Sequence, residues 1–298
     1  MSRAKLPIHN LNKKIVKMMR RLVVPALGAL ILLAAPCALE AQMRVSAAAD
    51  VATNSRYVWR GITRRNDWVL QPDLAVGTTW PRSSLAIGGW ANFEVSEADP
   101  EGTEVGLGQP FGEMNLWAQF EYLAGPFGIG VGYMRYFVDE GAAADVGTTV
   151  FNTTELYLDT RYRVGGLEPR ATLWVDVDDV EGAYFEASVA YRLPVIPIAV
   201  PSLYLKMLYG FSWGQAVSED DPEQGAYFGE NGLTHIDFSA ETQIYLPVPI
   251  GPLKRLYAVP ALHFQVNKDD ATQRVSRDPD DAGRGSFWWF GVALSWYK

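Results

Sequence analysis

Cysteine and histidine are scarce in this chain of 298 residues, which contains one cysteine, Cys37, and three histidines. A single cysteine excludes a disulfide framework and a thiolate metal site. Beyond residue 41 there is no run of 18 apolar residues, so the sequence predicts no transmembrane helix in that part. What is abundant is hydrophobic residues (48%), among them many aromatics (12% of the chain). This length and composition suit one large β domain or two ordinary domains.

The first forty residues have the layout of an export signal. Seven lysines and arginines precede the apolar run "LVVPALGALILLAA" at residues 22–35, and small residues follow it. This order, with a basic segment, then a short apolar segment and then small residues at a cleavage site, predicts a signal peptide. We therefore expect a signal peptide over residues 1–41, cleaved after Ala41, with Met18 or Met19 as alternative start sites.

Two other interpretations of this segment exist. A lipoprotein would be modified at Cys37, but Pro36 directly before it fits that processing poorly. A retained anchor would have to cross the membrane with about fourteen apolar residues, whereas a helical span needs about 20. The cleaved signal peptide is the interpretation that the sequence favours.

The mature chain is strongly acidic. Removal of residues 1–41 takes away seven bases and one acid, which leaves 19 bases, 33 acids and a net charge of −14. Binding to nucleic acid needs a basic surface, so nucleic acid is excluded as an expected partner. The export signal predicts a location in the bacterial envelope.

Alternation of apolar and polar residues recurs along the whole mature chain. In residues 113–122, for example, Leu116, Ala118 and Phe120 alternate with Trp117 and Gln119. A period of two is that of a β-strand, and runs of about ten residues match tilted strands that cross a bilayer. The sequence predicts an all-β transmembrane antiparallel β-barrel of about twelve strands. The strands are expected near residues 44–60, 68–80, 85–94, 113–122, 127–137, 153–164, 170–178, 184–193, 203–212, 233–246, 256–266 and 286–297.

The connections between these strands alternate in character. One set is brief or rich in proline and glycine, and the other is mostly longer and acidic, although two of its members, 61–67 and 179–183, are short. Short turns at one end and long loops at the other are typical of an outer-membrane barrel. The first set comprises 81–84, 123–126, 165–169, 194–202 and 247–255, and the longer members of the second comprise 95–112, 138–152, 213–232 and 267–285.

Alternation alone does not say which face lies outside, because a soluble barrel would turn its apolar face inward. Aromatic residues at the expected strand ends favour a membrane, where they form interfacial girdles. The final strand, 286–297, also resembles the C-terminal signal that the barrel-insertion machinery recognises. We expect its apolar face to contact lipid and the strand to pair with 44–60, which closes the barrel. The girdle residues are Tyr57, Trp59, Trp80, Phe93, Tyr122, Tyr162, Tyr191, Phe211 and Trp296, and the apolar face of the last strand is Trp288, Phe290, Val292, Leu294 and Trp296.

The segment "TNSRYVWRGITRRND" at residues 53–67 is the most distinctive in the chain. It resembles the first-strand signature of the Gcw_chp-type family of bacterial conserved-hypothetical outer-membrane β-barrel proteins. "QPDLAVG" and "GGWANFEV" are similar to that family's second and third strands, so the resemblance covers about residues 50–95. It implies the barrel fold and an outer-membrane location, but the family has no settled activity. Arg56 stands where the family often has aspartate.

In this segment we expect Tyr57 and Trp59 to continue the lipid-facing side of the first strand. Arg60 would then point into the lumen, and Gly61 would allow the chain to turn. Arg60 has two interpretations. It either determines which solutes pass, or it pairs with an interior carboxylate such as Asp73, which is the alternative we favour.

The inward faces of the expected strands carry many charges. Such charges must be hydrated or paired, because burial of an unpaired charge is costly. If hydrated, they line a narrow pore and select solutes; if paired, they form a salt-bridged, closed lumen. Arginines lie beside the short turns, hence near the periplasmic mouth. The predicted pore-lining residues are Arg60, Asp73, Glu155, Asp159, Arg161, Arg163, Arg170, Asp176, Glu186, Arg192, Lys206 and Glu241.

Catalytic and metal-binding patterns are weak. His235 and His263 are the two histidines beyond residue 41, and Asp237 falls on the same face as His235. Neither histidine has a serine in the arrangement of an outer-membrane phospholipase, so we expect hydrogen-bonded interior histidines, no catalytic residues and no cofactor. The acidic runs 219–223 and 278–281 lack EF-hand spacing, and no metal site is expected. They are predicted to be solvated loops bridged to lipopolysaccharide phosphates by divalent cations.

The sequence therefore predicts an exported protein of the bacterial outer membrane. Its leading function is a narrow channel for small hydrophilic solutes, with acidic outer loops that attract cations. The alternative is a structural or surface-interaction barrel with a closed, salt-bridged lumen, and an enzyme is the third hypothesis. The expected partners are outer-membrane lipid and lipopolysaccharide, the barrel-insertion machinery through strand 286–297, and small solutes.

Overall fold

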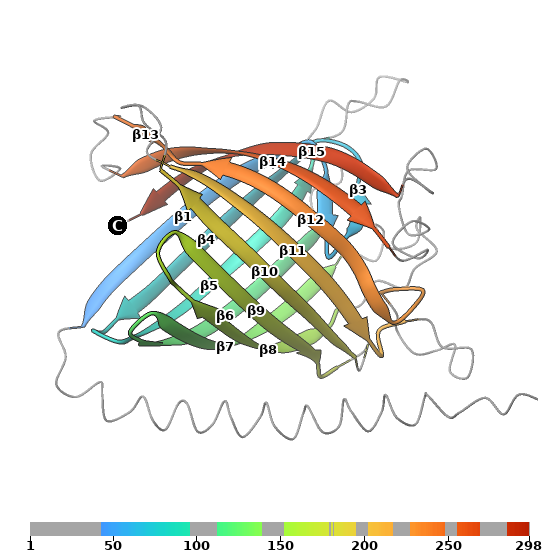
Figure 1. Cartoon of the computed structure of the whole chain (residues 1–298), viewed down its shortest axis with the longest axis horizontal. Coiled ribbons are helices and arrows are strands. Elements are labelled where there is room, and N and C mark those ends of the chain that lie inside the picture. The colour runs from blue at the N-terminus through green and yellow to red at the C-terminus, as the bar shows by residue number, and fades with distance from the viewer. Residues whose placement is uncertain are drawn as a thin grey trace, which may run out of the picture.

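The structure of the chain is a computed structural model (Figure 1). It describes residues 43–95, 112–138, 152–178, 180, 182–194, 202–216, 227–247, 255–268 and 285–297. Within these ranges, no helix is long and apolar enough to cross a membrane. The expected signal peptide at 1–41 and the acidic runs 219–223 and 278–281 lie outside the described residues.

Twelve antiparallel strands form the wall of a closed barrel (Figure 1). The strand β12 is interrupted at Gln243 and continues as β13, and both segments pair with β14, so together they form one wall strand. The predicted fold and strand number are confirmed. The wall consists of β1 (Arg44–Asn54), β4 (Val69–Thr79), β5 (Ser83–Glu94), β6 (Glu113–Ala124), β7 (Phe127–Val138), β8 (Thr154–Tyr162), β9 (Leu167–Asp176), β10 (Ala183–Leu193), β11 (Leu203–Trp213), β12 (Gly232–Thr242) with β13 (Ile244–Leu246), β14 (Leu256–Asn267) and β15 (Ser286–Tyr297).

The barrel closes where the first strand meets the last. β1 pairs with β15 in a register that places Ala49 opposite Trp296 and Asn54 opposite Gly291. One further bond, from the Ser55 amide to the Phe290 carbonyl at 2.8 Å, extends this seam. Closure leaves no sheet edge with unpaired backbone groups. The predicted pairing of the two ends is confirmed.

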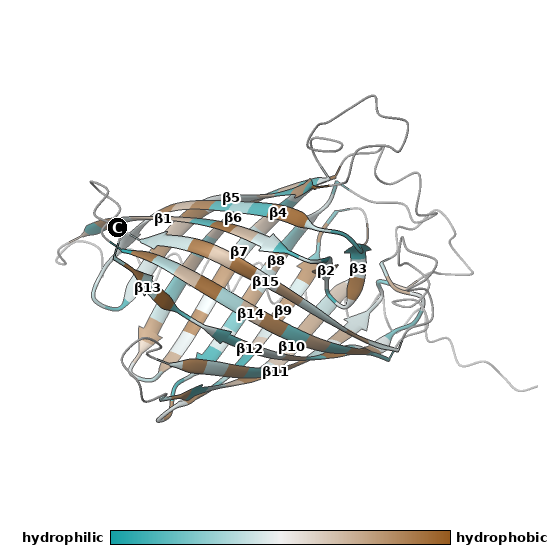
Figure 2. Cartoon of the chain, turned by 90° about the horizontal axis from the view of Figure 1, so that it is seen from above, coloured by the Kyte–Doolittle hydropathy of each residue, from teal (hydrophilic) through white to brown (hydrophobic). Residues whose placement is uncertain are grey.

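The outer surface of the barrel is apolar. On β15, the side chains of Trp288 and Phe290 are 60% and 50% exposed, whereas Phe287 and Ser295 on the inward face are 7% and 2% exposed. Leu74 in the middle of β4 is exposed in the same way. Figure 2 shows hydrophobic residues alternating with hydrophilic residues along the strands. A soluble barrel would show the reverse, with its apolar side chains inward.

The connections at the two ends of the barrel differ in length. At one end, which we call the short-turn end, residues 80–82, 125–126, 163–166, 194–202 and 247–255 join the strands. At the other, the long-connection end, the joining segments are 55–68, 95–112, 139–153, 177–182, 214–231 and 268–285. The predicted alternation of connections is confirmed, except that 177–182 is shorter than 194–202 and 247–255. The first connection is longer than the expected 61–67.

That first connection contains a hairpin that folds into the barrel. β2 (Tyr57–Trp59) pairs with β3 (Ile62–Arg65), and the two strands lie inside the barrel outline at the long-connection end (Figure 2). The turn residues Arg60 and Gly61 have φ angles of 50° and 88°, as in the tight hairpin turn with two left-handed residues. We call β2, β3 and this turn the inner hairpin.

The inner hairpin corrects two predictions. The first strand does not run from 44 to 60 but ends at Asn54, and Tyr57 and Trp59 do not lie on the lipid-facing side. Tyr57 is instead buried inside the barrel. The four polar residues from Thr53 to Arg56 interrupt the alternation at the bend, but they do not show that the chain then turns into the barrel.

Candidate functional site

The inner hairpin spans the lumen because it is bonded to opposite walls. The Tyr57 hydroxyl donates to the Glu113 carboxylate on β6 at 2.8 Å. On the other side, the side-chain amide of Gln265 on β14 donates to the Gly61 carbonyl at 2.7 Å. Burial, reinforced by the neighbouring Glu113, raises the pKa of Tyr57 well above its usual value, so its phenol keeps the proton that it donates.

Arg60 forms the central contact of the hairpin. Its guanidinium donates two hydrogen bonds, of 2.7 and 2.5 Å, to the two oxygens of Glu155 on β8. The Arg60 side chain is 5% exposed and that of Glu155 is fully buried. Tyr136 on β7 donates a third bond to Glu155 at 2.8 Å. The expected interior partner of Arg60 exists, but it is Glu155 and not Asp73.

Aromatic rings enclose the Arg60 guanidinium on its remaining sides. The guanidinium carbon lies 4.6 Å from the centre of the Trp59 ring, 5.2 Å from that of Trp174 and 4.3 Å from that of Tyr184. Rings at these distances attract a cation through their π faces. Trp59 and Trp174 pack on a small buried cluster inside the barrel, which consists of Ile62, Val180, Tyr184, Tyr227 and Phe228. The hairpin therefore has its own hydrophobic core at the long-connection end.

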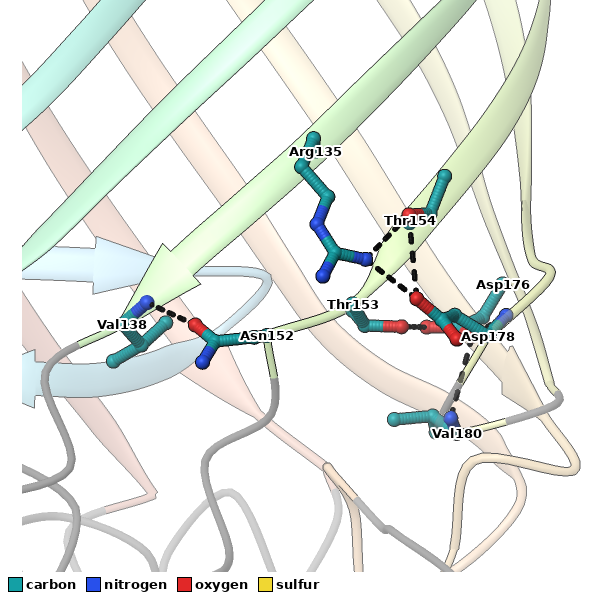
Figure 3. A network of polar contacts seen from close by, with 8 residues as sticks. All are labelled: Arg135, Val138, Asn152, Thr153, Thr154, Asp176, Asp178 and Val180. Atoms are coloured by element: carbon teal, nitrogen blue, oxygen red, sulfur yellow. Dashed lines mark hydrogen bonds and ion pairs between the residues drawn. The ribbon is translucent and has the colours of Figure 1, made fainter.

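Polar contacts fix the rim of the barrel beside the hairpin (Figure 3). Arg135 donates to the Thr154 hydroxyl at 2.7 Å and to the Asp178 carboxylate at 2.5 Å. Asp176 accepts hydrogen bonds from the backbone amides of Asp178 and Val180, at 3.0 and 3.3 Å. Asp176, predicted to line a pore, is thus buried and holds the turn between β9 and β10 in place.

Other predicted pore-lining residues form ion pairs nearer the short-turn end. Arg161 pairs with Glu121 at 2.5 Å, and Arg170 pairs with Asp159 at the same distance. Both pairs lie on inward faces of β6, β8 and β9, as predicted. Arg163 differs, because it follows the end of β8 and pairs with Glu168 at the turn. Its side chain is 58% exposed at the short-turn end, and its role in lining the lumen stays a prediction.

The remaining predicted residues differ in their exposure. Glu186 is partly exposed on the inward face of β10, whereas Lys206 and Glu241 are exposed on the inward faces of β11 and β12. Arg192 is exposed near the short-turn end, with its guanidinium carbon 5.5 Å from the centre of the Tyr204 ring. Asp73 lies beneath the inner hairpin, where it helps to line a cavity.

This cavity has a volume of about 410 Å³ and lies between the inner hairpin and the wall formed by β4 to β8. The predicted pore-lining set contains only charged residues, so the aromatic residues that line this cavity are not among those predicted. The alternation itself could have identified them, since Trp117 and Tyr157 share a face with Glu113 and Glu155. The lining comprises Tyr57, Trp59, Asp73, Trp90, Asn115, Trp117, Gln119, Met134, Tyr136 and Tyr157.

Two of these rings lie against glycines of neighbouring strands. A methyl group at Gly88 on β5 would lie 2.4 Å from the Trp117 ring, and one at Gly132 on β7 would lie 2.1 Å from the Tyr157 ring. Real side chains do not approach so closely, so both rings need glycine beneath them. Both rings also line the cavity.

The two histidines occupy different settings. His235 is buried against Gly61 of the inner hairpin, and its ring nitrogen Nδ1 lies 3.0 Å from the Thr234 hydroxyl. His263 stacks on the Trp289 ring at 3.6 Å, with Nδ1 3.3 Å from the Asp237 carboxylate. The expected partners of interior histidines are thus present.

The pair of His263 and Asp237 supplies two of the three members of an acyl-transfer triad, the base and its orienting carboxylate. Ser239 lies opposite His263 in the pairing of β12 with β14, but no hydrogen bond joins the two side chains. An activated nucleophile needs that bond. Within the described ranges, no three histidine, cysteine or acidic side chains are placed to hold a metal ion.

No protein-family model and no curated protein matches the chain. Among solved structures, the chain is similar to LpxR from Salmonella typhimurium, with 9% identity, 84% of this chain and 99% of that chain covered, and a TM-score of 0.46. It is also similar to an outer membrane channel from Pseudomonas putida F1, with 12% identity, coverage of 87% and 95%, and a TM-score of 0.42. A third similar structure is the outer membrane protein OprD from Pseudomonas aeruginosa, with 11% identity, coverage of 87% and 95%, and a TM-score of 0.35. At these identities the similarities concern the barrel fold alone.

Proposed function

We propose that this protein is a β-barrel of the bacterial outer membrane and forms a narrow channel for small hydrophilic solutes, with a preference for cations. The apolar outer surface of a closed barrel supports the membrane location, since lipid is the solvent that such a surface matches. The resemblance of residues 53–67 to the Gcw_chp-type family fits the same location. The export signal expected at residues 1–41 would direct the chain there.

The orientation follows from the lengths of the connections. In outer-membrane barrels the short turns face the periplasm and the long loops face the exterior. The inner hairpin would then narrow the lumen at the external mouth. Strand β15 would be the segment that the barrel-insertion machinery recognises, and lipid and lipopolysaccharide would surround the wall.

The observation that carries the channel proposal is the contrast between the two parts of the lumen. The inner hairpin fills the long-connection end, whereas Lys206 and Glu241 nearer the short-turn end remain exposed on inward faces. Exposed charges in a lumen must be hydrated. A water-filled vestibule that leads to a constriction is the arrangement of a selective pore.

A closed structural or surface-interaction barrel is the second candidate. The buried pair of Arg60 and Glu155 favours it, because such a pair holds the inner hairpin firmly across the lumen. In that case the ion pairs would stiffen the barrel and the long connections would contact partners outside the cell.

Single-channel conductance of the refolded protein in planar bilayers, at two salt concentrations, separates these candidates. A channel gives discrete, ion-selective steps, and the reversal potential in a salt gradient favours cations. A correctly folded barrel that remains silent supports the closed structural barrel. A variant with residues 57–65 replaced by a short Gly-Ser linker is the matched control, since a lumen blocked only by the inner hairpin would conduct once the hairpin is removed.

A further inference from the structure

Two carboxylates face each other inside the barrel, and no cationic side chain of the described residues pairs with either. Asp50 on β1 and Asp73 on β4 are directly opposite in the strand register, and both lie on the inward face. The Ser295 hydroxyl donates to Asp50, and the Trp117 indole donates to Asp73. Among the residues that the structure describes, neither carboxylate has an ion-pair partner. Like charges placed opposite each other on adjacent strands repel, so this arrangement favours an added cation.

A hydrogen-bond acceptor without a donor lies in the cavity that Asp73 lines. The Asn115 side chain donates through its amide nitrogen to Glu113 at 2.8 Å, but its carbonyl oxygen is buried and has no hydrogen-bond donor. The residue as a whole is 7% exposed and lines the cavity together with Asp73. Buried polar atoms in native proteins nearly always have a partner. This oxygen is therefore available to accept a hydrogen bond from a molecule in the cavity.

Aromatic rings form the other surface of this cavity. Trp117 and Tyr157 lie so close to Gly88 and Gly132 that a methyl group there would clash with the rings, and both rings line the cavity. Ring faces attract cations, and the cavity volume of about 410 Å³ falls in the range of about 300–1,000 Å³ typical of small-molecule sites. A sugar would also stack on such rings, but its neutral hydroxyls would leave the opposed carboxylates of Asp50 and Asp73 without a counter-charge.

We propose that the cavity beneath the inner hairpin binds a small primary organic cation, an alkylammonium ion whose N–H groups donate to Asp73 and Asn115 while its methylene groups contact the aromatic rings. The inference rests on the proposed function, since it names the class of solute that the lumen would take from its water-filled part. An inorganic cation would use the carboxylates but would leave the aromatic surface without a role.

Saturation-transfer NMR on the full barrel in lipid nanodiscs tests the site directly, without requiring conduction. The probe is n-butylammonium chloride, and 1-butanol serves as the neutral molecule of the same size. The variant Asp73→Asn removes the charge at the cavity. Glu241→Gln is the matched control, because Glu241 is another inward carboxylate without an ion-pair partner among the described residues, and it lies outside the cavity. If Asp73→Asn fails to fold, Trp90→Leu removes one aromatic surface of the cavity instead.

We expect a saturable signal for butylammonium. Its apparent affinity should fall at least about tenfold in Asp73→Asn, which is the effect typical of a lost hydrogen bond to a charged group. The affinity should be unchanged in Glu241→Gln. Equal binding of 1-butanol, or equal loss in both carboxylate variants, would overturn the inference. A barrel that conducts without binding butylammonium would refute the site and leave the channel standing. A barrel that binds but never conducts would support the site and refute the channel.

Discussion

Arg60 in the inner hairpin and Glu155 on β8 are joined by two hydrogen bonds, of 2.7 and 2.5 Å, across a separation of 95 residues in sequence. Arg60 adopts a left-handed backbone conformation, with φ of 50°, that a residue with a side chain rarely takes. Residues in such conformations persist where surrounding contacts hold them, and here the contacts are Glu155 and three aromatic rings. The pair therefore fixes both the shape of the turn and its position across the lumen.

Replacement of Glu155 by glutamine is expected to release the inner hairpin. It leaves the buried Arg60 guanidinium without a counter-charge, and loss of one partner from a buried pair costs about 3–5 kcal/mol. We expect the free energy of unfolding in lipid vesicles to fall by that order and the single-channel conductance to rise. Urea titration and planar-bilayer recordings measure the two effects.

The control is Glu168→Gln, which removes the partner of the exposed Arg163 at the short-turn end. An exposed pair contributes about 0–1 kcal/mol, so this variant should behave like the wild type. The double variant Arg60→Gln, Glu155→Gln should recover part of the lost stability, because no charge then remains buried alone. Equal effects of the two single glutamate variants would show that the hairpin is not held by this pair.

Alanine at Gly61 is expected to displace the tip of the inner hairpin. Its φ of +88° disfavours any side chain, and a methyl group would lie 2.7 Å from the buried His235 ring. Gly125→Ala is the matched control, since its φ of +61° is also left-handed but nothing lies within 4 Å of the added methyl. Both variants carry backbone strain of about 1–3 kcal/mol, and only Gly61→Ala adds a clash.

Trypsin added to intact vesicles measures this displacement. Arg64 and Arg65 lie in the inner hairpin, and cleavage after them, detected by mass spectrometry, should be faster in Gly61→Ala than in Gly125→Ala. Equal cleavage in the two variants would mean that His235 yields to the added methyl group without moving the hairpin.

The wall of the barrel could be predicted from sequence because a bilayer imposes a local rule. Every strand that crosses it must alternate, and the chain must close on itself, so the pairing of β1 with β15 followed from the pattern. The inner hairpin could not be predicted in this way. Tyr57 and Trp59 share one face of an extended segment, as residues of a wall strand do, and their partners on β6 and β7 are distant in the sequence.

The partner of Arg60 illustrates the same limit. Asp73 was the nearer inward carboxylate along the chain, but a hairpin that bends into the lumen reaches β8, on another part of the wall. Beyond the bend at Ser55, Ile62 and Trp59 of the hairpin pack with Tyr184 and Phe228, which are distant in the sequence. Local periodicity identifies which residues point inward, whereas contacts across the lumen depend on the folded barrel as a whole.

A charge placed on the outer face tests the membrane location. Leu74 lies at the middle of β4 and is 62% exposed, whereas Val164, at the short-turn end, is 51% exposed. Lysine on a lipid-facing surface costs about 2–4 kcal/mol at the bilayer midplane and about 0–1 near its edges. We expect Leu74→Lys to lower the free energy of unfolding in vesicles by the larger amount and Val164→Lys by the smaller. If the two variants cost the same in urea titrations, the exposed band of the barrel does not lie in lipid.

Neutralising Arg161 is expected to increase selectivity for cations. Its guanidinium pairs with Glu121 inside the lumen and is 20% exposed, so Arg161→Gln frees a carboxylate where screening by solvent is weak. The reversal potential in a salt gradient should shift toward that of the cation. Arg163→Gln removes a charge of the same kind at the exposed turn, where salt screens it, and should shift the potential much less. If the two variants shift the reversal potential equally, the charges on the inward face of β8 do not set ion selectivity. A reversal potential of the wild-type protein that favours anions would contradict the cation preference itself.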